Sequence, residues 1–426
     1  RNSVDYISED EFNSVINSNF TFEKNPHVGL SISGGPDSMA LLLLIKEWIR
    51  RKSGKITVFH FDHKMRKNSS KEAKWLKKCV SNLGIKFYLL KWKRDEELAL
   101  SMKNAREARY EKILELSKKL KVIHLMTAHH SNDNLETYYM RKKRNSSTLG
   151  LSSIPKILIK ENLQIIRPLL SFSKERLINT CNFFNVKWIE DSSNLNMQYE
   201  RPRVRKELGD KTPRQLTKIK KEFNKIKKSN EIMEKKIRNF FLNYLIFFEY
   251  GVFQIDKNKF LKCSKEIQIE ILKKILTTSS GKIFPPRESS IINLIKSIQS
   301  NHYLRYTLHS CLLEINSNKI LVFREASNIK EEKKIIPKGK PYLWDNRFFL
   351  YSKNFKIECE KINSQNWVFL KKYFSFKKTH LNFFILSSLP LLKIKRKLFI
   401  PFVSLCNVDY DFYFKPTIPI SRKNYF

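Results

Sequence analysis

The chain has 426 residues, which is too long for one ordinary hydrophobic core, so we expect two or three domains. Lys and Arg together number 82 against 41 Asp and Glu, giving a formal net charge of +41. Such a chain attracts polyanions, and nucleic acid is the usual one. A bias toward Lys, Asn, Ile and Phe, with only 10 Gly, accounts equally well for much of this charge, so the charge alone favours nucleic-acid binding only weakly.

The cysteines and the apolar runs exclude several classes of protein. The six cysteines are widely spaced and form no Cys-x-x-Cys pair, which argues against a disulfide scaffold, a zinc ribbon and an iron–sulfur cluster. The longest apolar runs, such as residues 39–45, fall short of the roughly 20 residues that span a bilayer. Residues 1–20 lack the apolar core of a signal peptide. We therefore expect a soluble, cytoplasmic protein.

The first half of the chain alternates predicted strands and helices. Strands are predicted over residues 28–32, 56–60, 86–90 and 122–127, and helices over residues 37–51, 69–83, 104–120 and 132–144. A hairpin over 155–168 and a helix over 174–185 follow, and this domain ends near Leu208. The βαβα order predicts an α/β domain with a parallel sheet, in which ligands bind at the carboxyl ends of the strands.

The second half is less regular. Thr212 and Pro213 predict a helix start, and apolar residues then recur at helical spacing as far as Phe240, with Lys on the other face. This pattern fits a packed helix with a solvated face, and an arm that also touches phosphates is the alternative. Residues 326–340 are polar and punctuated by Pro and Gly, which predicts a linker. The predicted domains are residues 1–208, a mainly helical 209–325, and a small α+β unit over 341–426.

The strongest chemical signal is a glycine turn between the first strand and the first of these helices. It consists of Ser33, Gly34, Gly35, Pro36, Asp37 and Ser38. At a helix start, backbone amides and the helix dipole favour anions, and glycines let phosphate oxygens approach the main chain. An Asp would repel bare phosphate, so Asp37 predicts a bridging Mg²⁺. The pattern is neither a Walker A loop nor a dinucleotide-binding turn.

Two further groups of polar residues follow later strands and helices. Asp133 and Glu136 lie three residues apart on a predicted helix and share a face, so they can hold a metal or an ammonium group. His129 precedes Asp133 by four residues and can donate to a phosphate or a developing anion. Arg106 and Arg109 are candidates to bind phosphate, although surface ion pairs explain them as well.

These motifs resemble those of a known family. The turn at residues 33–38 resembles the SGGxDS signature of the PP-loop ATP pyrophosphatases, which cleave ATP to AMP and pyrophosphate and adenylate a carbonyl oxygen. Together with FDHKMRKNSSKEA, AREARY, AHHSNDNLET, RPLL and WIEDSSN, it makes residues 27–208 resemble the tRNA(Ile)-lysidine synthase family. The likeness fades afterwards and returns weakly over residues 371–401.

The resemblance implies an ATP-dependent carbon–nitrogen ligase with a PP-loop domain and two C-terminal tRNA-binding domains. Its substrates would be ATP, L-lysine and tRNA(Ile) with a CAU anticodon. The O2 of the wobble cytidine would be adenylated and then displaced by the lysine ε-amine, with release of AMP and pyrophosphate.

The resemblance also implies roles for particular residues. The ATP-binding residues would be Ser33, Gly34, Gly35, Pro36, Asp37 and Ser38, with Asp37 also on Mg²⁺. Arg109 and His129 would face the phosphates and the reacting centre, and Asp133 and Glu136 would receive lysine. The residues expected near the tRNA path are Asp191, Ser193, Asn194, Tyr199, Arg201 and Arg205.

The chain departs from the family pattern at two places. Residues 144–147 read Arg-Asn-Ser-Ser where the family has Arg-Gly-x-Gly, so a hinged loop has lost both glycines. Pro202 replaces an Asn in the last motif. Two alternatives stay open: another PP-loop tRNA-modifying enzyme, although the Cys-x-x-Cys pairs of the thiolases are absent, and a tRNA-binding protein whose loop has decayed.

Overall fold

The computed structural model describes residues 5–62, 69–91, 102–144, 151, 154–160, 163–190, 197–300, 303–331, 333–373, 382–395, 397–403 and 409–420. The side chains of residues 102–107 and 373 are outside this description. The described residues divide into two compact units, 5–230 and 231–420, and each is described by itself. Among the described residues, no helix is long and apolar enough to cross a membrane.

The first unit is built on a six-stranded sheet in the order β3-β2-β1-β4-β6-β5. Five strands run parallel, and β5 joins β6 as an antiparallel edge hairpin. The strands are β1 (His27–Ser31), β2 (Lys55–Asp62), β3 (Lys86–Lys91), β4 (His124–Thr127), β5 (Ile157–Lys160) and β6 (Leu163–Ile166). The predicted parallel sheet is thereby confirmed.

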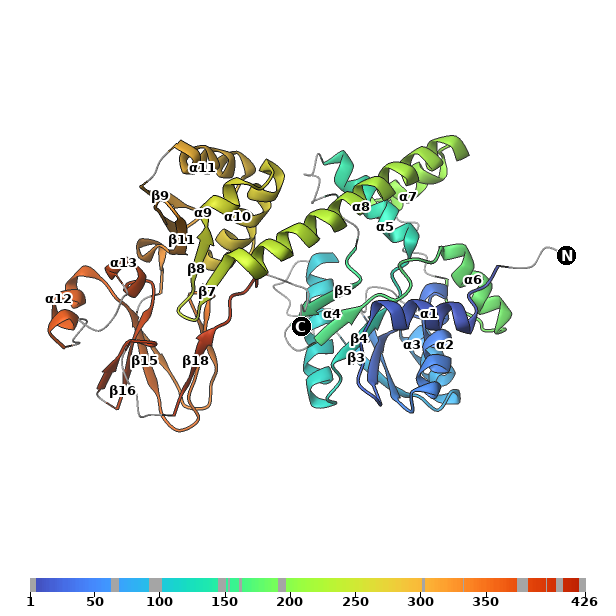
Figure 1. Ribbon diagram of the computed structural model, residues 1–426. Helices are drawn as coiled ribbons and strands as arrows, with labels where there is room; N and C mark the ends of the chain where they lie inside the picture. The colour runs from blue at the N-terminus through green and yellow to red at the C-terminus, as the bar shows by residue number, and fades with distance from the viewer. Residues whose placement is uncertain are drawn as a thin grey trace. The chain divides into compact units, whose positions relative to one another are not determined.

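Helices cover both faces of this sheet (Figure 1). The helices of this unit are α1 (Glu9–Asn19), α2 (Pro36–Arg51), α3 (Ser69–Asn82), α4 (Met102–Lys119), α5 (Ser131–Lys143), α6 (Lys174–Phe183) and α7 (Glu200–Gly209), of which α5 and α7 pack against each other. Because strand side chains alternate between faces, Leu30 and Met126 share a buried core with α1, α2, α3 and α6. Phe59 and Leu125 face the opposite way and pack with Ile113 of α4. The two cores fix the strand ends that carry the predicted site.

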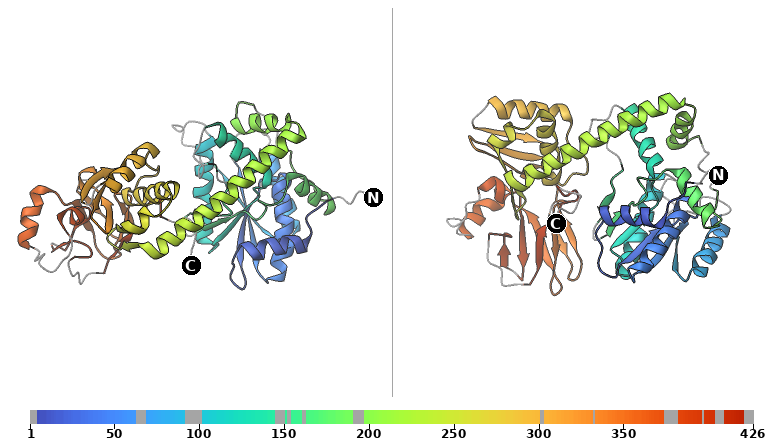
Figure 2. Two further views of the ribbon diagram at one scale, coloured as in Figure 1. Left: turned by 45° about the horizontal axis from the view of Figure 1, so that its top comes forward. Right: turned by 45° about the vertical axis from the view of Figure 1, so that its right-hand side comes forward.

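A long helix, α8 (Pro213–Tyr244), follows this domain. It begins at the predicted cap, where Thr212 Oγ1 accepts a hydrogen bond from the Gln215 amide at 3.3 Å and Gln215 Oε1 accepts one from the Thr212 amide at 3.0 Å. Phe223, Ile237 and Phe240 are buried, as their spacing predicted. The boundary between the two units falls inside α8, which Figure 2 shows as one continuous helix.

The second unit begins with a sheet that the sequence analysis did not foresee. Five antiparallel strands in the order β7-β8-β11-β10-β9 pack with helices α9, α10 and α11. The elements are β7 (Leu245–Phe248), β8 (Val252–Asp256), α9 (Lys257–Leu261), α10 (Lys265–Ser280), α11 (Glu288–Ser300), β9 (Leu304–Leu308), β10 (Cys311–Ile315) and β11 (Lys319–Arg324). Together with α8, helices still form the larger part of residues 209–325, as expected.

The remainder of the second unit is a small α+β structure, as expected. It contains two antiparallel sheets, β12-β15-β16-β17 and β13-β14-β18. The elements are β12 (Lys334–Ile336), β13 (Tyr342–Trp344), β14 (Phe348–Tyr351), β15 (Ile357–Lys361), α12 (Ser364–Tyr373), α13 (Phe383–Leu386), β16 (Pro390–Ile394), β17 (Lys397–Phe399) and β18 (Asp411–Phe414). Residues 326–340, expected as a linker, instead supply the edge strand β12 and bury Ile329 and Ile336.

A buried group of charges joins these two parts of the second unit. Asp345 Oδ2 accepts hydrogen bonds from Arg324 Nε at 2.9 Å and from Arg347 Nε at 2.7 Å. All three side chains are buried, and burial lowers the pKa of Arg347. Arg347 also donates to the Ser388 carbonyl at 2.7 Å. One carboxylate therefore bridges two guanidinium groups and links β11 to the turn between β13 and β14. The expected boundary between residues 325 and 341 stays a prediction.

Candidate active site at the carboxyl edge of the parallel sheet

Strand register brings the predicted motifs to one edge of the first sheet. Ser31, at the end of β1, lies opposite Phe59 of β2 and Thr127 of β4. The Ile32 amide donates to the Phe59 carbonyl at 3.0 Å, and His60 Nδ1 lies 2.9 Å from the Ile32 carbonyl oxygen. The chain segments that leave β1 and β4 therefore emerge side by side. Burial lowers the pKa of His60, which favours its neutral form beneath the loop.

The glycine turn is held in shape by its own serines. Ser38 Oγ accepts a hydrogen bond from the Gly34 amide at 3.1 Å and lies 3.2 Å from Ser33 Oγ. Gly35 caps α2 with extended backbone, and Pro36 takes the first helical position, where its missing amide is not needed. The helix α2 therefore begins directly at the turn, as the sequence predicted, and anion binding by its first amides stays a prediction.

The position of Gly34 requires a positive φ and leaves no room for a Cβ atom, and glycine alone satisfies both conditions without strain. Its φ is +95°, in a region that favours glycine, and a Cβ built there would lie 2.6 Å from Ile189 Cδ1. The Ile189 amide donates to the Gly34 carbonyl at 2.9 Å, which fixes the backbone of Ile189 and leaves only its side chain able to turn away. The segment after α6 thus packs directly on the turn.

A buried histidine lies between two of the predicted carboxylates. His130 Nε2 is 3.6 Å from Asp37 Oδ2 and 3.6 Å from Asp133 Oδ2. His130 also donates its backbone amide to Asp133 Oδ2 at 3.0 Å. The structure therefore joins Asp37 on α2 and Asp133 on α5 through a residue to which the sequence analysis gave no role.

The environment of Asp37 fits a divalent cation. Its Oδ1 atom is buried and has no hydrogen-bond partner within the described part of the chain. Among the described residues there is no group of three or more His, Cys, Asp or Glu side chains that could enclose a metal ion. Mg²⁺ commonly uses one or two carboxylates and completes its shell with water and substrate phosphates, so an incomplete protein shell suits it.

The predicted lysine-binding and tRNA-binding residues meet each other. Arg205 Nε donates to Glu136 Oε1 at 2.7 Å, and Arg205 Nη2 donates to Oε2 at 3.3 Å. Arg201 Nε lies 4.0 Å from the same carboxylate. The hydrogen bond with Glu136 raises the pKa of Arg205. Pro202 lies in the first turn of α7, where a missing amide costs no helical hydrogen bond.

Other contacts place the remaining predicted residues. The Arg109 guanidinium carbon on α4 lies 5.3 Å from the Tyr110 ring centroid, and His129 Nδ1 lies 2.9 Å from Thr127 Oγ1. Tyr199 is the N-cap residue of α7. Three expected tRNA-path residues, Asp191, Ser193 and Asn194, lie outside the described residues, as do residues 145–147 and the side chain of Arg106.

A cysteine also lies beneath the turn. Cys181 Sγ on α6 donates to the Pro36 carbonyl at 3.3 Å. Burial, with the nearby negative charge of Asp37, raises the pKa of this thiol to about 12. The group is therefore a neutral packing element at physiological pH, which agrees with the expectation of buried free thiols.

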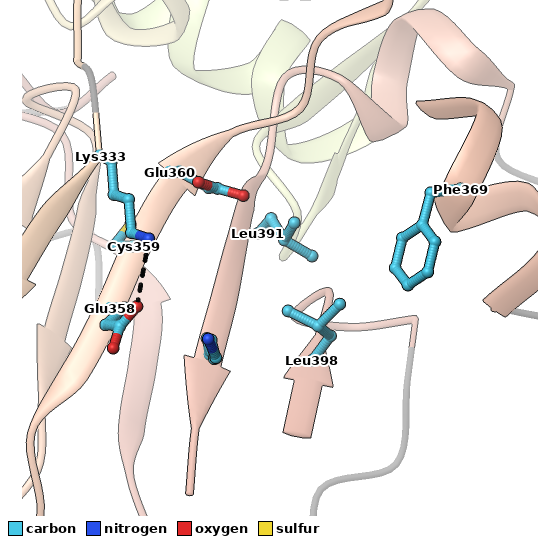
Figure 3. Close-up of a pocket in the computed structure, with 8 residues that line it drawn as sticks. Lys333, Glu358, Cys359, Glu360, Phe369, Leu391 and Leu398 are labelled. Carbon is cyan, nitrogen blue, oxygen red and sulfur yellow. Dashed lines mark ion pairs between the residues drawn. The ribbon is translucent and has the colours of Figure 1, made fainter. Parts of the chain in front are cut away.

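The second unit contains a cavity of different character. It has a volume of about 360 Å³ and none of the predicted nucleotide-site residues line it. Figure 3 shows Leu391 and Leu398 on the sheet and Phe369 on α12 bordering this space, with the Lys333–Glu358 ion pair beside β15. This mixed lining offers neither the glycine turn nor the convergent carboxylates of the sheet edge.

Comparisons with known proteins agree with this geometry. Residues 5–212 match the family model of the PP-loop domain, so the first unit is an ATP-binding domain of the PP-loop class. A protein named tRNA(Ile)-lysidine synthase from Rickettsia bellii (strain RML369-C) is 32% identical over 78% of this chain and 76% of its own length. The protein of the same name from Rickettsia typhi is 30% identical over 94% of this chain and 95% of its own length. The chain belongs to the tRNA(Ile)-lysidine synthase family.

A solved structure gives a more distant likeness. The U34-tRNA thiolase NcsA from Methanococcus maripaludis, determined with its [4Fe-4S] cluster, matches with a TM-score of 0.44 and 15% sequence identity. The match covers 53% of this chain and 78% of that one.

Proposed function

We propose that this protein is an ATP-dependent carbon–nitrogen ligase that joins L-lysine to a cytidine of an isoleucine tRNA. The observation that carries the proposal is the meeting of the glycine turn, Asp37 and Asp133 around His130 at one sheet edge. It combines a site for a nucleotide triphosphate with carboxylates that receive a free amine. The family relationship supplies the substrates, which we take to be tRNA(Ile) with a CAU anticodon, L-lysine and ATP. Such an enzyme acts in the cytoplasm.

In the first step, the O2 atom of the wobble cytidine attacks the α-phosphate of ATP, and pyrophosphate leaves. The amides at the start of α2, with Ser33 and Ser38, bind the phosphates and offset their charge. Asp37, whose Oδ1 has no hydrogen-bond partner among the described residues, would hold Mg²⁺, and such an ion would neutralise charge on the departing pyrophosphate. Arg109 and His129 face the phosphates and the reacting centre.

In the second step, lysine attacks C2 of the adenylated base. Its amine is protonated at neutral pH, with a reference pKa of about 10.4, so it must lose a proton before it reacts. Asp133 and Glu136 receive the amino acid, and Asp133 is the candidate to accept that proton. The new C–N bond forms as the C–O bond breaks, and AMP departs. Arg201 and Arg205 on α7 contact the tRNA.

Pyrophosphate release from ATP tests the proposal when tRNA and lysine are each omitted in turn. We expect release that requires both. Release without a lysine requirement would indicate another modification, and tight tRNA binding without release would indicate a binding protein.

Two variants assign the roles. Asp37→Ala should abolish adenylation, whereas Glu136→Ala should mainly impair the use of lysine. Glu175→Ala is the matched control, because Glu175 is an exposed carboxylate in the first turn of α6 in the same unit, and it should retain normal turnover. Normal turnover in Asp37→Ala or Glu136→Ala would contradict the assignment.

A further inference from the structure

The ion pair between Glu136 and Arg205 joins two groups that the proposed reaction needs for different ligands. Glu136 on α5 is 3% exposed, and Arg205 on α7 contacts both of its carboxylate oxygens, at 2.7 and 3.3 Å. A carboxylate that is engaged in this way has little capacity left for an incoming ammonium group. An arginine that is engaged in this way has its charge offset by the carboxylate, so its attraction for a phosphate is weakened although its Nη1 donors stay available.

The two partners differ in their freedom to leave. The side chain of Glu136 is 4% exposed, whereas that of Arg205 is 37% exposed and that of the nearby Arg201 is 41% exposed. A buried carboxylate requires a cation at all times, because an uncompensated buried charge is strongly destabilising. A guanidinium at the surface can turn into water without such a cost. If one partner is exchanged, it is therefore the arginine.

We propose that Arg205 occupies the place of the amino-acid ammonium on Glu136 and is released toward RNA phosphate when the amino acid binds. The inference rests on the proposed function, because it takes lysine and tRNA as the two ligands. Arg205 is then a specificity-determining residue. Only a ligand whose cation satisfies the buried carboxylate can displace it.

The exchange has a thermodynamic consequence. Lysine frees Arg205 for the tRNA, and tRNA draws Arg205 away from Glu136, so each ligand tightens the binding of the other. Linkage requires the two factors to be equal. We expect a factor on the order of 10, within the range of roughly 5 to 150 that is typical of such coupling.

The experiment measures four dissociation constants for the full-length protein without ATP, so that no turnover occurs. L-lysine is titrated with and without a transcript of the CAU isoleucine tRNA, and the transcript is titrated with and without L-lysine. In Arg205→Met, lysine alone should bind several-fold more tightly than to the wild type, and the coupling factor should fall to about 1. Arg203→Met is the matched control. It removes one exposed charge from the same helix, so it should weaken tRNA binding somewhat and leave the coupling intact.

A second variant covers the case in which Arg205→Met does not fold. In Glu136→Gln the side chain at position 136 is neutral and needs no cation beside it. Arg205 should therefore be available to RNA phosphate even before lysine binds. Lysine binding should weaken, while tRNA binding without lysine should become tighter. A purely structural ion pair predicts the opposite, because a disturbed α7 would bind tRNA less well. Weaker tRNA binding in Glu136→Gln would overturn the proposal.

The remaining outcomes separate the two levels of inference. If the wild type turns over with lysine and tRNA but binds them independently, the exchange is wrong and the proposed function stands. If lysine binding is lost in Arg205→Met, the arginine builds the lysine site and the exchange is also wrong. If the wild type shows no lysine-dependent reaction at all, the proposed function itself fails.

Discussion

Replacing Gly34 by alanine tests whether the shape of the turn, and not only its sequence, makes the nucleotide site. The backbone at Gly34 has φ of +95°, and a side chain held in such a region costs about 1 to 3 kcal/mol. The new Cβ would also lie 2.6 Å from Ile189 Cδ1. Because the amide hydrogen bond holds the backbone of Ile189, relief comes from rotation of its half-buried side chain, and we take the further cost as that of a distorted rotamer, about 0.5 to 1.5 kcal/mol.

Gly84→Ala is the matched control. Gly84 also has a positive φ, +71°, but a Cβ there would meet nothing within 4 Å. Both variants lose the same entropy from the unfolded chain, so Gly34→Ala should be the less stable by about the rotamer cost, 0.5 to 1.5 kcal/mol. Urea unfolding at 25 °C, followed by circular dichroism, measures this difference. The double variant Gly34→Ala with Ile189→Ala should remove the overlap between the new Cβ and the Ile189 side chain, and it should keep the backbone strain that comes from the positive φ at residue 34.

The same pair of variants should separate in activity. A displaced amide at the turn loses a hydrogen bond to a charged phosphate, worth about 1.5 to 3 kcal/mol. We therefore expect kcat/KM for ATP in pyrophosphate release to fall about 10- to 100-fold in Gly34→Ala and to stay normal in Gly84→Ala. Equal stability of the two variants, with wild-type kcat/KM in Gly34→Ala, would refute the reasoning.

Three further predictions concern stability. Thr212→Ala removes the side-chain cap of α8, so the free energy of unfolding in urea should fall by about 1 kcal/mol. An unchanged urea concentration at the unfolding midpoint would contradict the capping role. Asp345→Asn keeps a residue type that tolerates a positive φ but removes the carboxylate from two buried guanidinium groups. The free energy of unfolding of the second unit should therefore fall by about 3 to 5 kcal/mol. A fall below about 1 kcal/mol would argue against a stabilising role of this buried charge group. Burial lowers the pKa of His60 from 6.5, so below that pH the unfolded chain gains a proton that the folded chain does not. Stability should therefore fall as the pH drops below about 6.5, and the fall should be shallower in His60→Gln; identical pH profiles of the melting temperature would exclude His60 as a source.

The sequence predicted the first unit well because its signals are local. Short apolar runs mark the strands, helical spacing marks the helices, and the turn at residues 33–38 contains the glycines that its geometry needs. The sheet of the second unit escaped prediction in part because the turn between β9 and β10 lacks those signals. His309 and Ser310, between β9 and β10, both have positive φ, at 56° and 60°, without glycine or asparagine. A chain with only 10 Gly uses other residues at such positions, and its hairpins are therefore hard to recognise.

The role of His130 was hidden for a different reason. Four-residue spacing placed His129 one helical turn before Asp133, but this rule holds only inside a helix. The helix α5 begins at Ser131, and His130 is its N-cap residue with extended backbone, which brings its ring between Asp37 and Asp133. The end of the preceding strand at Thr127, three residues before His130, was the available signal. The pairing of Glu136 with Arg205 spans 69 residues, and local spacing carries no information about it.

The local balance of charge decides how this edge of the sheet can act. The chain as a whole carries a net charge of +41, yet the residues that meet here include Asp37, Asp133 and Glu136. An anionic nucleotide would be repelled by them unless cations lie among them, and surface lysines beyond about 8 Å are screened by salt. Arg205 already neutralises Glu136, His130 lies between the other two, and the free oxygen of Asp37 is suited to a metal ion. We therefore expect cation binding at these carboxylates, and not the overall basic charge, to decide whether this edge can hold ATP beside an amine.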